Sequence, residues 1–165
     1  MIIMRFRTLT YEELKLLEDE FKHFLIVNHL YKEEWESLNA RNPQKAQEIV
    51  ALFSDTVLEK VYHKINFLEL RTPYCFSIYH NEKESVKTIQ IQSPDKKHLL
   101  EKNEEIEKAL NHHYRELDIY FGNKKYEKTK ADFVFELLEQ GCQISNETVW
   151  HAFSSFIGQG KTPTH

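Results

Sequence analysis

Three short runs in residues 67–91 set the fold class: FLEL at 67–70, YCFSIY at 74–79 and VKTIQI at 86–91. All three are rich in aromatic and β-branched residues, which favour strands. Thr72-Pro73 separates the first two runs, and the polar segment 81–84 separates the last two. We therefore predict a three-stranded antiparallel meander over about residues 66–92.

Apolar residues recur at helical spacing on both sides of these strands. Thr10 and Glu13 have the spacing of a capping box, and Gly141-Cys142 has the pattern of a Schellman motif that ends a helix. The expected helices cover residues 11–28, 32–40, a longer one from Pro43, 93–121 with a break near Asn103, 124–140, and a last one capped by Ser145 or Asn146. This order predicts an α+β fold in which helices flank a small three-stranded antiparallel β-meander.

Length and composition indicate a single folded unit. The chain has 165 residues, of which 41% are hydrophobic and 29% are charged, enough apolar material for a real core. Only 4 Gly and 4 Pro are present, which disfavours turn-rich β-sandwiches. We predict one α+β domain over residues 1–158 and a C-terminal tail at 159–165.

Charge and cysteine content narrow the classes of function. Lys and Arg number 22 against 26 Asp and Glu, a net charge of −4, which disfavours general nucleic-acid binding and leaves only a local site open. Cys75 and Cys142 lie far apart and form no CxxC pattern, so a disulfide framework or a structural zinc is not expected. Neither a signal-peptide core nor a membrane-spanning run is expected, whether translation starts at Met1 or Met4. These features predict a cytoplasmic protein.

Several segments of the sequence resemble those of a known protein family. They are Met4-Arg5-Phe6-Arg7 before Leu9-Thr10, Phe53-Ser54-Asp55 within the long helix, and residues 135–142 followed by Ile144-Ser145. In these segments the chain resembles a family of small bacterial cytoplasmic proteins that carry a domain of unknown function. The resemblance spans nearly the whole chain. Because its motifs are helix caps and core positions, it implies no functional residue.

Nine histidines suggest a metal site, and some have acidic neighbours at helical spacing. With 26 acidic residues among 165, about half of the histidines should have such a neighbour by chance. The weak candidates for metal ligands are Glu20, His23, His112, His113 and Glu116. We expect that these residues, with Glu59 and His63, do not converge on one ion, and that the protein carries no cofactor.

One basic segment opposes the negative charge of the whole chain. Residues 124–130 contain Lys124, Lys125, Tyr126, Lys128 and Lys130 with a single Glu. Lysines interleaved with an aromatic residue can bind phosphate and stack a base. The same pattern is typical of a solvated helix start in which the tyrosine folds inward.

Two other patterns resemble a phosphate-binding loop and a cysteine nucleophile, and we reject both. The end of the chain, Gly158-Gln159-Gly160-Lys161-Thr162, has no Gly where a P-loop needs one and no room for a following helix. Cys142 and His151 could pair as nucleophile and base, but the helix-end motif explains Cys142 more simply.

We therefore expect a non-catalytic protein-interaction or regulatory module whose sheet edge or uncovered sheet face meets a protein partner or a second copy. The alternative is a nucleic-acid or nucleotide-binding protein that uses Lys124–Lys130. A metal-dependent enzyme is the third hypothesis. Because no assembled catalytic site is recognisable in the sequence, we favour a protein without enzymatic activity.

Overall fold

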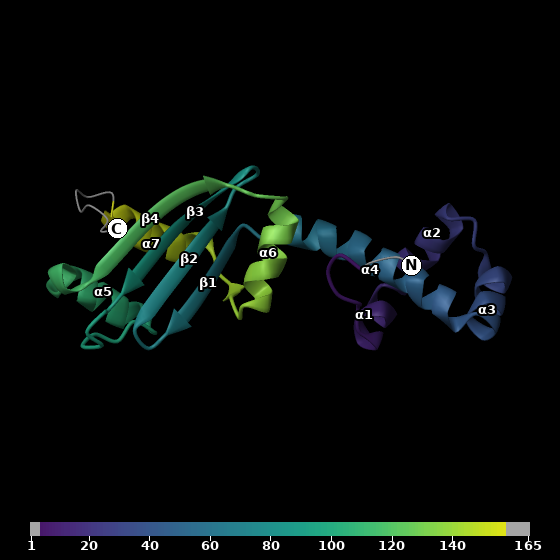
Figure 1. The fold of residues 1–165 in the computed structure, drawn as a ribbon, viewed down its shortest axis with the longest axis horizontal. Coiled ribbons are helices and arrows are strands. Elements are labelled where there is room, and N and C mark those ends of the chain that lie inside the picture. The colour runs from purple at the N-terminus through teal and green to yellow at the C-terminus, as the bar shows by residue number, and fades with distance from the viewer. Residues whose placement is uncertain (1–3, 158–165) are drawn as a thin grey trace. The chain divides into compact units, whose positions relative to one another are not determined.

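The computed structural model describes residues 4–157 and shows an α+β protein (Figure 1). Its internal contacts divide the chain into two compact units, Met1–Val61 and Tyr62–His165. The single-domain organisation of residues 1–158 stays a prediction. The expected tail at 159–165 and the P-loop-like segment 158–162 lie outside the described residues.

The first unit is helical. The expected helices from residue 32 and from Pro43 are confirmed, whereas the one expected over residues 11–28 is divided at Leu17. Leu17 is the C-cap of the helix over Tyr11–Leu16 and also the N-cap of the helix over Glu18–Val27. The elements are α1 (Tyr11–Leu16), α2 (Glu18–Val27), α3 (Lys32–Arg41) and α4 (Pro43–His63), whose last two residues belong to the second unit.

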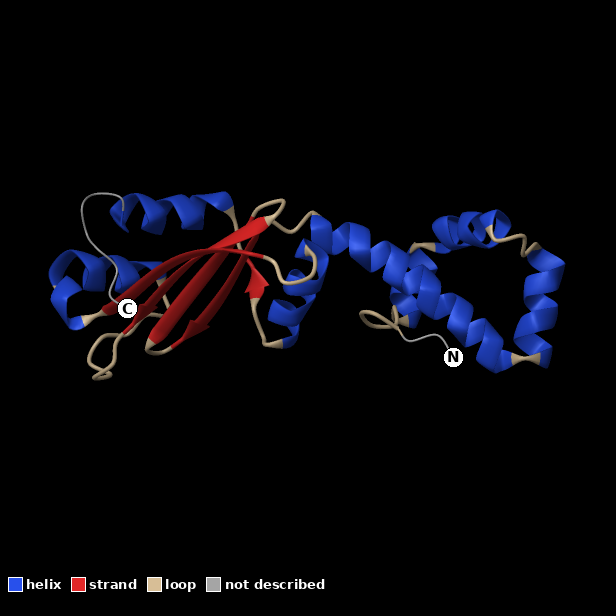
Figure 2. Ribbon diagram, turned by 45° about the horizontal axis from the view of Figure 1, so that its top comes forward, coloured by secondary structure: helices blue, strands red, loops and turns tan. Residues whose placement is uncertain are grey.

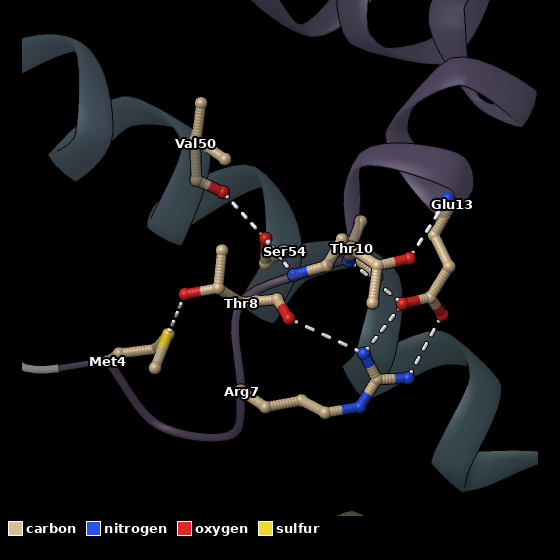
Figure 3. A network of polar contacts seen from close by, with 8 residues as sticks. Met4, Arg7, Thr8, Thr10, Glu13, Val50 and Ser54 are labelled. Carbon is tan, nitrogen blue, oxygen red and sulfur yellow. Dashed lines mark hydrogen bonds and ion pairs between the residues drawn. The ribbon is translucent and has the colours of Figure 1, made fainter.

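Polar contacts fix the start of this unit (Figure 3). The Thr10 side chain accepts the Glu13 N–H, and the Glu13 carboxylate accepts the Thr10 N–H, so the expected capping box is confirmed. The Arg7 guanidinium donates to both Glu13 oxygens at 2.8 and 3.0 Å. This hydrogen bond is the main cause that lowers the pKa of Glu13 to about 2. The buried Ser54 hydroxyl accepts the Leu9 N–H at 3.1 Å, which holds the segment before α1 against α4.

The second unit contains a five-stranded antiparallel sheet in the order β4-β3-β2-β1-β5. The predicted meander forms its centre, so the α+β class is confirmed. The prediction of only three strands is wrong, because two segments outside residues 66–92 extend the sheet at its edges. The strands are β1 (Phe67–Thr72), β2 (Cys75–Asn81), β3 (Ser85–Gln92), β4 (Asp118–Lys125) and β5 (Gln143–Ile144).

The spacing of Leu117 and Phe121 continues that of the preceding helix and predicts a helix where the structure has strand β4, so this prediction is wrong. In the structure that helix, α5 (Asn103–His112), ends early, and a single 3-10 turn over Tyr114–Glu116 leads into the strand. The run Ile119-Tyr120-Phe121 suits a pleated surface, and pairing with β3 overrides the helical spacing. The expected helix over 124–140 accordingly begins later, as α6 (Lys130–Glu139).

The helix expected over residues 93–102 is also absent. The Ser93 hydroxyl accepts the His98 N–H at 3.2 Å, and Asp95 accepts the Lys97 N–H at 3.1 Å. Lys96 has a positive φ of 58°, which no α-helix accommodates. These local bonds compete with helix formation, and they set the position of His98.

Two helices close one face of the sheet (Figures 1 and 2). Helices α5 and α7 (Glu147–Ile157) pack their apolar residues against strand residues such as Phe76 and Ile89. On the other face, α6 covers one end, where Phe133 meets the Tyr79 ring at 6.1 Å between centroids. Within this unit, no other described helix covers this second face, and we call it the open face (Figure 1).

The expected end of α6 and the expected start of α7 are both confirmed. Gly141 has a φ of 98°, and the Cys142 N–H donates to the Leu137 carbonyl at 3.0 Å, as a Schellman motif requires. Asn146 accepts the Val149 N–H at 3.0 Å and so caps α7.

Candidate functional site

A cavity of about 480 Å³ lies where the open face meets α6 and the connection between β4 and α6. Its sheet side is formed by Tyr79, Thr88, Tyr120 and Gly122, and its helix side includes Phe133. This volume is typical of sites that hold a small ligand or one protruding side chain. Burial raises the pKa of the Tyr79 hydroxyl, which therefore stays a neutral hydrogen-bonding group at neutral pH.

Tyr120 and Gly122 shape the sheet side of this cavity. Both residues lie on the open face of β4, because side chains alternate along a strand. The Tyr120 ring folds back over Gly122, so that a Cβ atom added to Gly122 would lie only 2.3 Å from the Tyr120 hydroxyl oxygen. A side chain at position 122 would therefore displace the Tyr120 ring from this position. Tyr120 remains 44% exposed despite this contact.

The basic segment predicted from the sequence forms the rim of the same cavity. Lys124 and Lys125 end β4, Lys128 lies in the following connection, and all three are exposed. The Lys124 ammonium lies 6.0 Å from the centre of the Phe133 ring, within reach of a cation–π contact.

Tyr126 is fixed by the protein itself. Its hydroxyl donates to the Glu82 carbonyl at 2.7 Å, and its ring lies 5.4 Å from that of Phe133, between centroids. Burial raises the pKa of this hydroxyl well above its ordinary range. The ring is therefore a structural part of the cavity wall.

Lys130 is separate from the other lysines of the segment. It is only 6% exposed, and its ammonium donates to the Asn66 side-chain oxygen at 2.6 Å. Burial lowers its pKa. The segment consequently presents three lysines at the surface.

Acidic groups line the cavity in equal number. Glu127, Asp132 and Glu136 accompany Lys124, Lys125 and Lys128 around the opening. Asp132 also helps to begin α6, since its N–H donates to the Thr129 hydroxyl at 3.2 Å. A phosphate site needs an excess of positive charge, whereas this lining is balanced and suits a ligand with groups of both signs.

The cavity borders an edge of the sheet. Strand β4 is eight residues long and, among the described segments, pairs only with β3. Tyr120 and Phe121 are 44% and 36% exposed at this edge. The opposite edge is formed by β5, which has two residues.

The metal-ligand candidates are distributed over the molecule. Glu20 and His23 lie on α2, and both line a shallow apolar hollow of the helical unit. His113 and Glu116 are brought together near the end of α5, where they meet His98. Spacing along the chain predicted His113 and Glu116 as candidates, but not His98. The approach of His98 depends on the irregular segment before α5 and has no signal in the sequence.

Cys142 and His151 have separate roles. The Cys142 thiol is buried, and burial raises its pKa, which opposes formation of a nucleophilic thiolate. The His151 ring pairs with Glu147 at 3.1 Å on the exposed side of α7.

The geometry defines an α+β protein with an eight-residue edge strand and, beside it, a cavity of balanced charge. The family model of a family of unknown function (DUF6495) matches residues 4–158, and the chain belongs to this family. Comparison with curated proteins gave no match. Comparison with solved structures gave none either. Among the described residues, no helix combines the length and the apolar character needed to cross a membrane.

Proposed function

We propose that this protein is a non-catalytic protein-interaction module, in which an extended segment of a partner protein binds along β4. The observation that carries the proposal is the eight-residue edge beside the cavity. The proposed place of action is the bacterial cytoplasm.

An edge strand offers one row of unpaired backbone N–H and C=O groups, which a second extended chain can pair with. Such pairing provides affinity with little dependence on sequence, and adjoining pockets then select particular side chains. Here the cavity lies on the open face beside β4, where an alternate side chain of an added strand would point. The edge and the cavity can therefore act together.

The lining of the cavity favours a peptide over a polyanion. The three exposed lysines face three carboxylates, and hydroxyl groups of Tyr79 and Thr88 add neutral donors and acceptors. A peptide carries groups that match this mixture. The lysines at the rim and the neighbouring Tyr126 also support the alternative of a nucleic-acid or nucleotide ligand. However, Tyr126 already donates a hydrogen bond to the Glu82 carbonyl and packs against the Phe133 ring, which opposes stacking of a base on it.

The proposal can be tested by affinity purification of the full chain from its native cells, with and without nuclease. The test variant is Tyr120→Lys, which places a charge on the edge strand, a device that natural sheets use against pairing. The matched control is Leu99→Lys, since Leu99 is 50% exposed and belongs neither to β4 nor to the cavity.

We expect a specific protein to be recovered with the wild type and with Leu99→Lys, to survive nuclease treatment and to be lost with Tyr120→Lys. Recovery that is equal for both variants would overturn the role of the β4 edge. Recovery of nucleic acid, or of proteins only through nucleic acid, would favour the alternative.

A further inference from the structure

Two histidines and one carboxylate from separate parts of the chain meet beside α5. The Glu116 Oε2 atom lies 3.0 Å from His98 Nε2 and 3.2 Å from His113 Nδ1. The two imidazole rings are stacked, with centroids 4.3 Å apart and planes inclined by 22°. The three atoms able to bind a metal all lie within 4.8 Å of one another.

Backbone contacts hold each of these residues in place. His98 follows the Ser93–Lys97 turn and donates its N–H to the Ser93 hydroxyl. His113 caps the end of α5, with its N–H donating to the Ala109 carbonyl at 2.8 Å. The Glu116 N–H then donates to the His113 carbonyl at 2.9 Å, which ties the carboxylate to the second histidine.

We propose that His98, His113 and Glu116 form a binding site for a divalent transition-metal ion of the Zn²⁺ class. Tetrahedral zinc with bonds of about 2.0–2.1 Å places its ligand atoms about 3.4 Å apart. The two separations that involve Glu116, 3.0 and 3.2 Å, require shifts of only a few tenths of an ångström. The ligand atoms of His98 and His113 lie within 4.8 Å of each other, and their rings must move to the same spacing when an ion binds. Two imidazoles with one carboxylate suit Zn²⁺, Ni²⁺ or Cu²⁺ better than Mg²⁺ or Ca²⁺, which prefer oxygen ligands alone.

The surroundings leave room for the remaining ligands of such an ion. A hollow of about 240 Å³ adjoins His98 and His113, so that water can complete the coordination. The carbonyl end of α5 carries partial negative charge, which favours a cation beside His113. Lys97 and Lys108 border the same hollow and oppose a cation, while Glu105 partly offsets them.

The site is tested by titrating untagged, metal-free protein with Zn²⁺ in a calorimeter, and with Co²⁺ followed by visible absorption. The test variants are His98→Gln and Glu116→Gln. The matched control is His151→Gln, because His151 and Glu147 form a similar exposed pair at 3.1 Å and belong to no three-residue cluster among the described residues. Circular dichroism establishes that each variant is folded.

We expect one Zn²⁺ per chain, a wild-type affinity preserved in His151→Gln, and at least about tenfold weaker binding in both test variants. The Co²⁺ complex should show the intense visible bands of a low-symmetry site only where His98 and Glu116 are intact. Wild-type protein that binds no stoichiometric Zn²⁺ would overturn the proposal. So would folded test variants that bind Zn²⁺ as tightly as the control, since Glu116 would then be only a hydrogen-bond acceptor between two imidazoles.

Discussion

The two faces of the sheet differ in what their side chains do. On the face covered by α5 and α7, Phe76 and Ile89 are fully buried and Phe153 is 1% exposed. On the open face, Tyr120 is 44% exposed and lies against a cavity with balanced charge. The contrast indicates that the covered face provides stability, whereas the exposed Tyr120 ring on the open face contributes little to it.

The largest expected effect is on the covered face. Phe153→Ala removes a fully buried ring that contacts Phe76 at 5.1 Å between centroids, so the free energy of unfolding should fall by about 3–5 kcal/mol. Tyr120→Ala should cost less than about 1 kcal/mol, because much of that ring is already in water. Urea denaturation followed by circular dichroism measures both. Equal losses would remove the distinction between the faces.

The next effect separates the lysines of the basic segment. Lys130→Gln breaks the buried contact with Asn66 and should lower the free energy of unfolding by about 1–3 kcal/mol. Lys128→Gln changes an exposed side chain and should alter it by less than about 0.5 kcal/mol. Equal midpoints in urea for the two variants would show that Lys130 is not a structural residue.

A smaller effect depends on pH and also belongs to the covered face. The His80 ring stacks on Phe67 and contacts Trp150, and burial lowers its pKa from the ordinary value of 6.5. Glu82 and Glu147 oppose this shift, whereas Lys87 and His151 reinforce it.

Because the unfolded chain binds the proton more readily, stability should fall as the pH drops through 6.5 towards the lower pKa of the folded state. His80→Gln should make the free energy of unfolding less dependent on pH between 7.5 and 5. An unchanged slope in urea titrations at several pH values would contradict this role.

The smallest effect on stability is expected at the cavity rim. Changing Lys124, Lys125 and Lys128 together to Gln should shift the free energy of unfolding by less than about 0.5 kcal/mol per residue. Under the protein-binding proposal, elution from heparin should be early for the wild type and for the variant alike. A strong, salt-dependent retention that the three changes abolish would instead support the nucleic-acid alternative.

Local signals in the sequence were sufficient for the centre of the sheet and for several helix ends. The alternating runs of β1–β3, the Thr10 cap and the Gly141 motif depend on residues close together in the chain. Strand β4 was missed because its residues continue a helical spacing, and only pairing with β3 decides between the two structures.

The candidate sites show the same limit. The sequence located Lys124, Lys125 and Lys128, but the burial of Lys130 depends on Asn66, a residue distant in the chain. The approach of His98 to Glu116 likewise arises from tertiary packing, and no local pattern indicates it. The contact of Tyr120 with Gly122 is local, but it exists only because residues 118–125 form a strand.

The most direct test of the protein-binding account is photo-crosslinking in native cells. p-Benzoylphenylalanine replaces Tyr120 on the edge strand β4 in one variant, and His151, on the exposed side of α7, in the other. We predict a discrete crosslinked product at position 120 that protease removes and nuclease does not, with no such product at position 151. The same product at both positions, no product at position 120, or a product that nuclease removes would contradict the account.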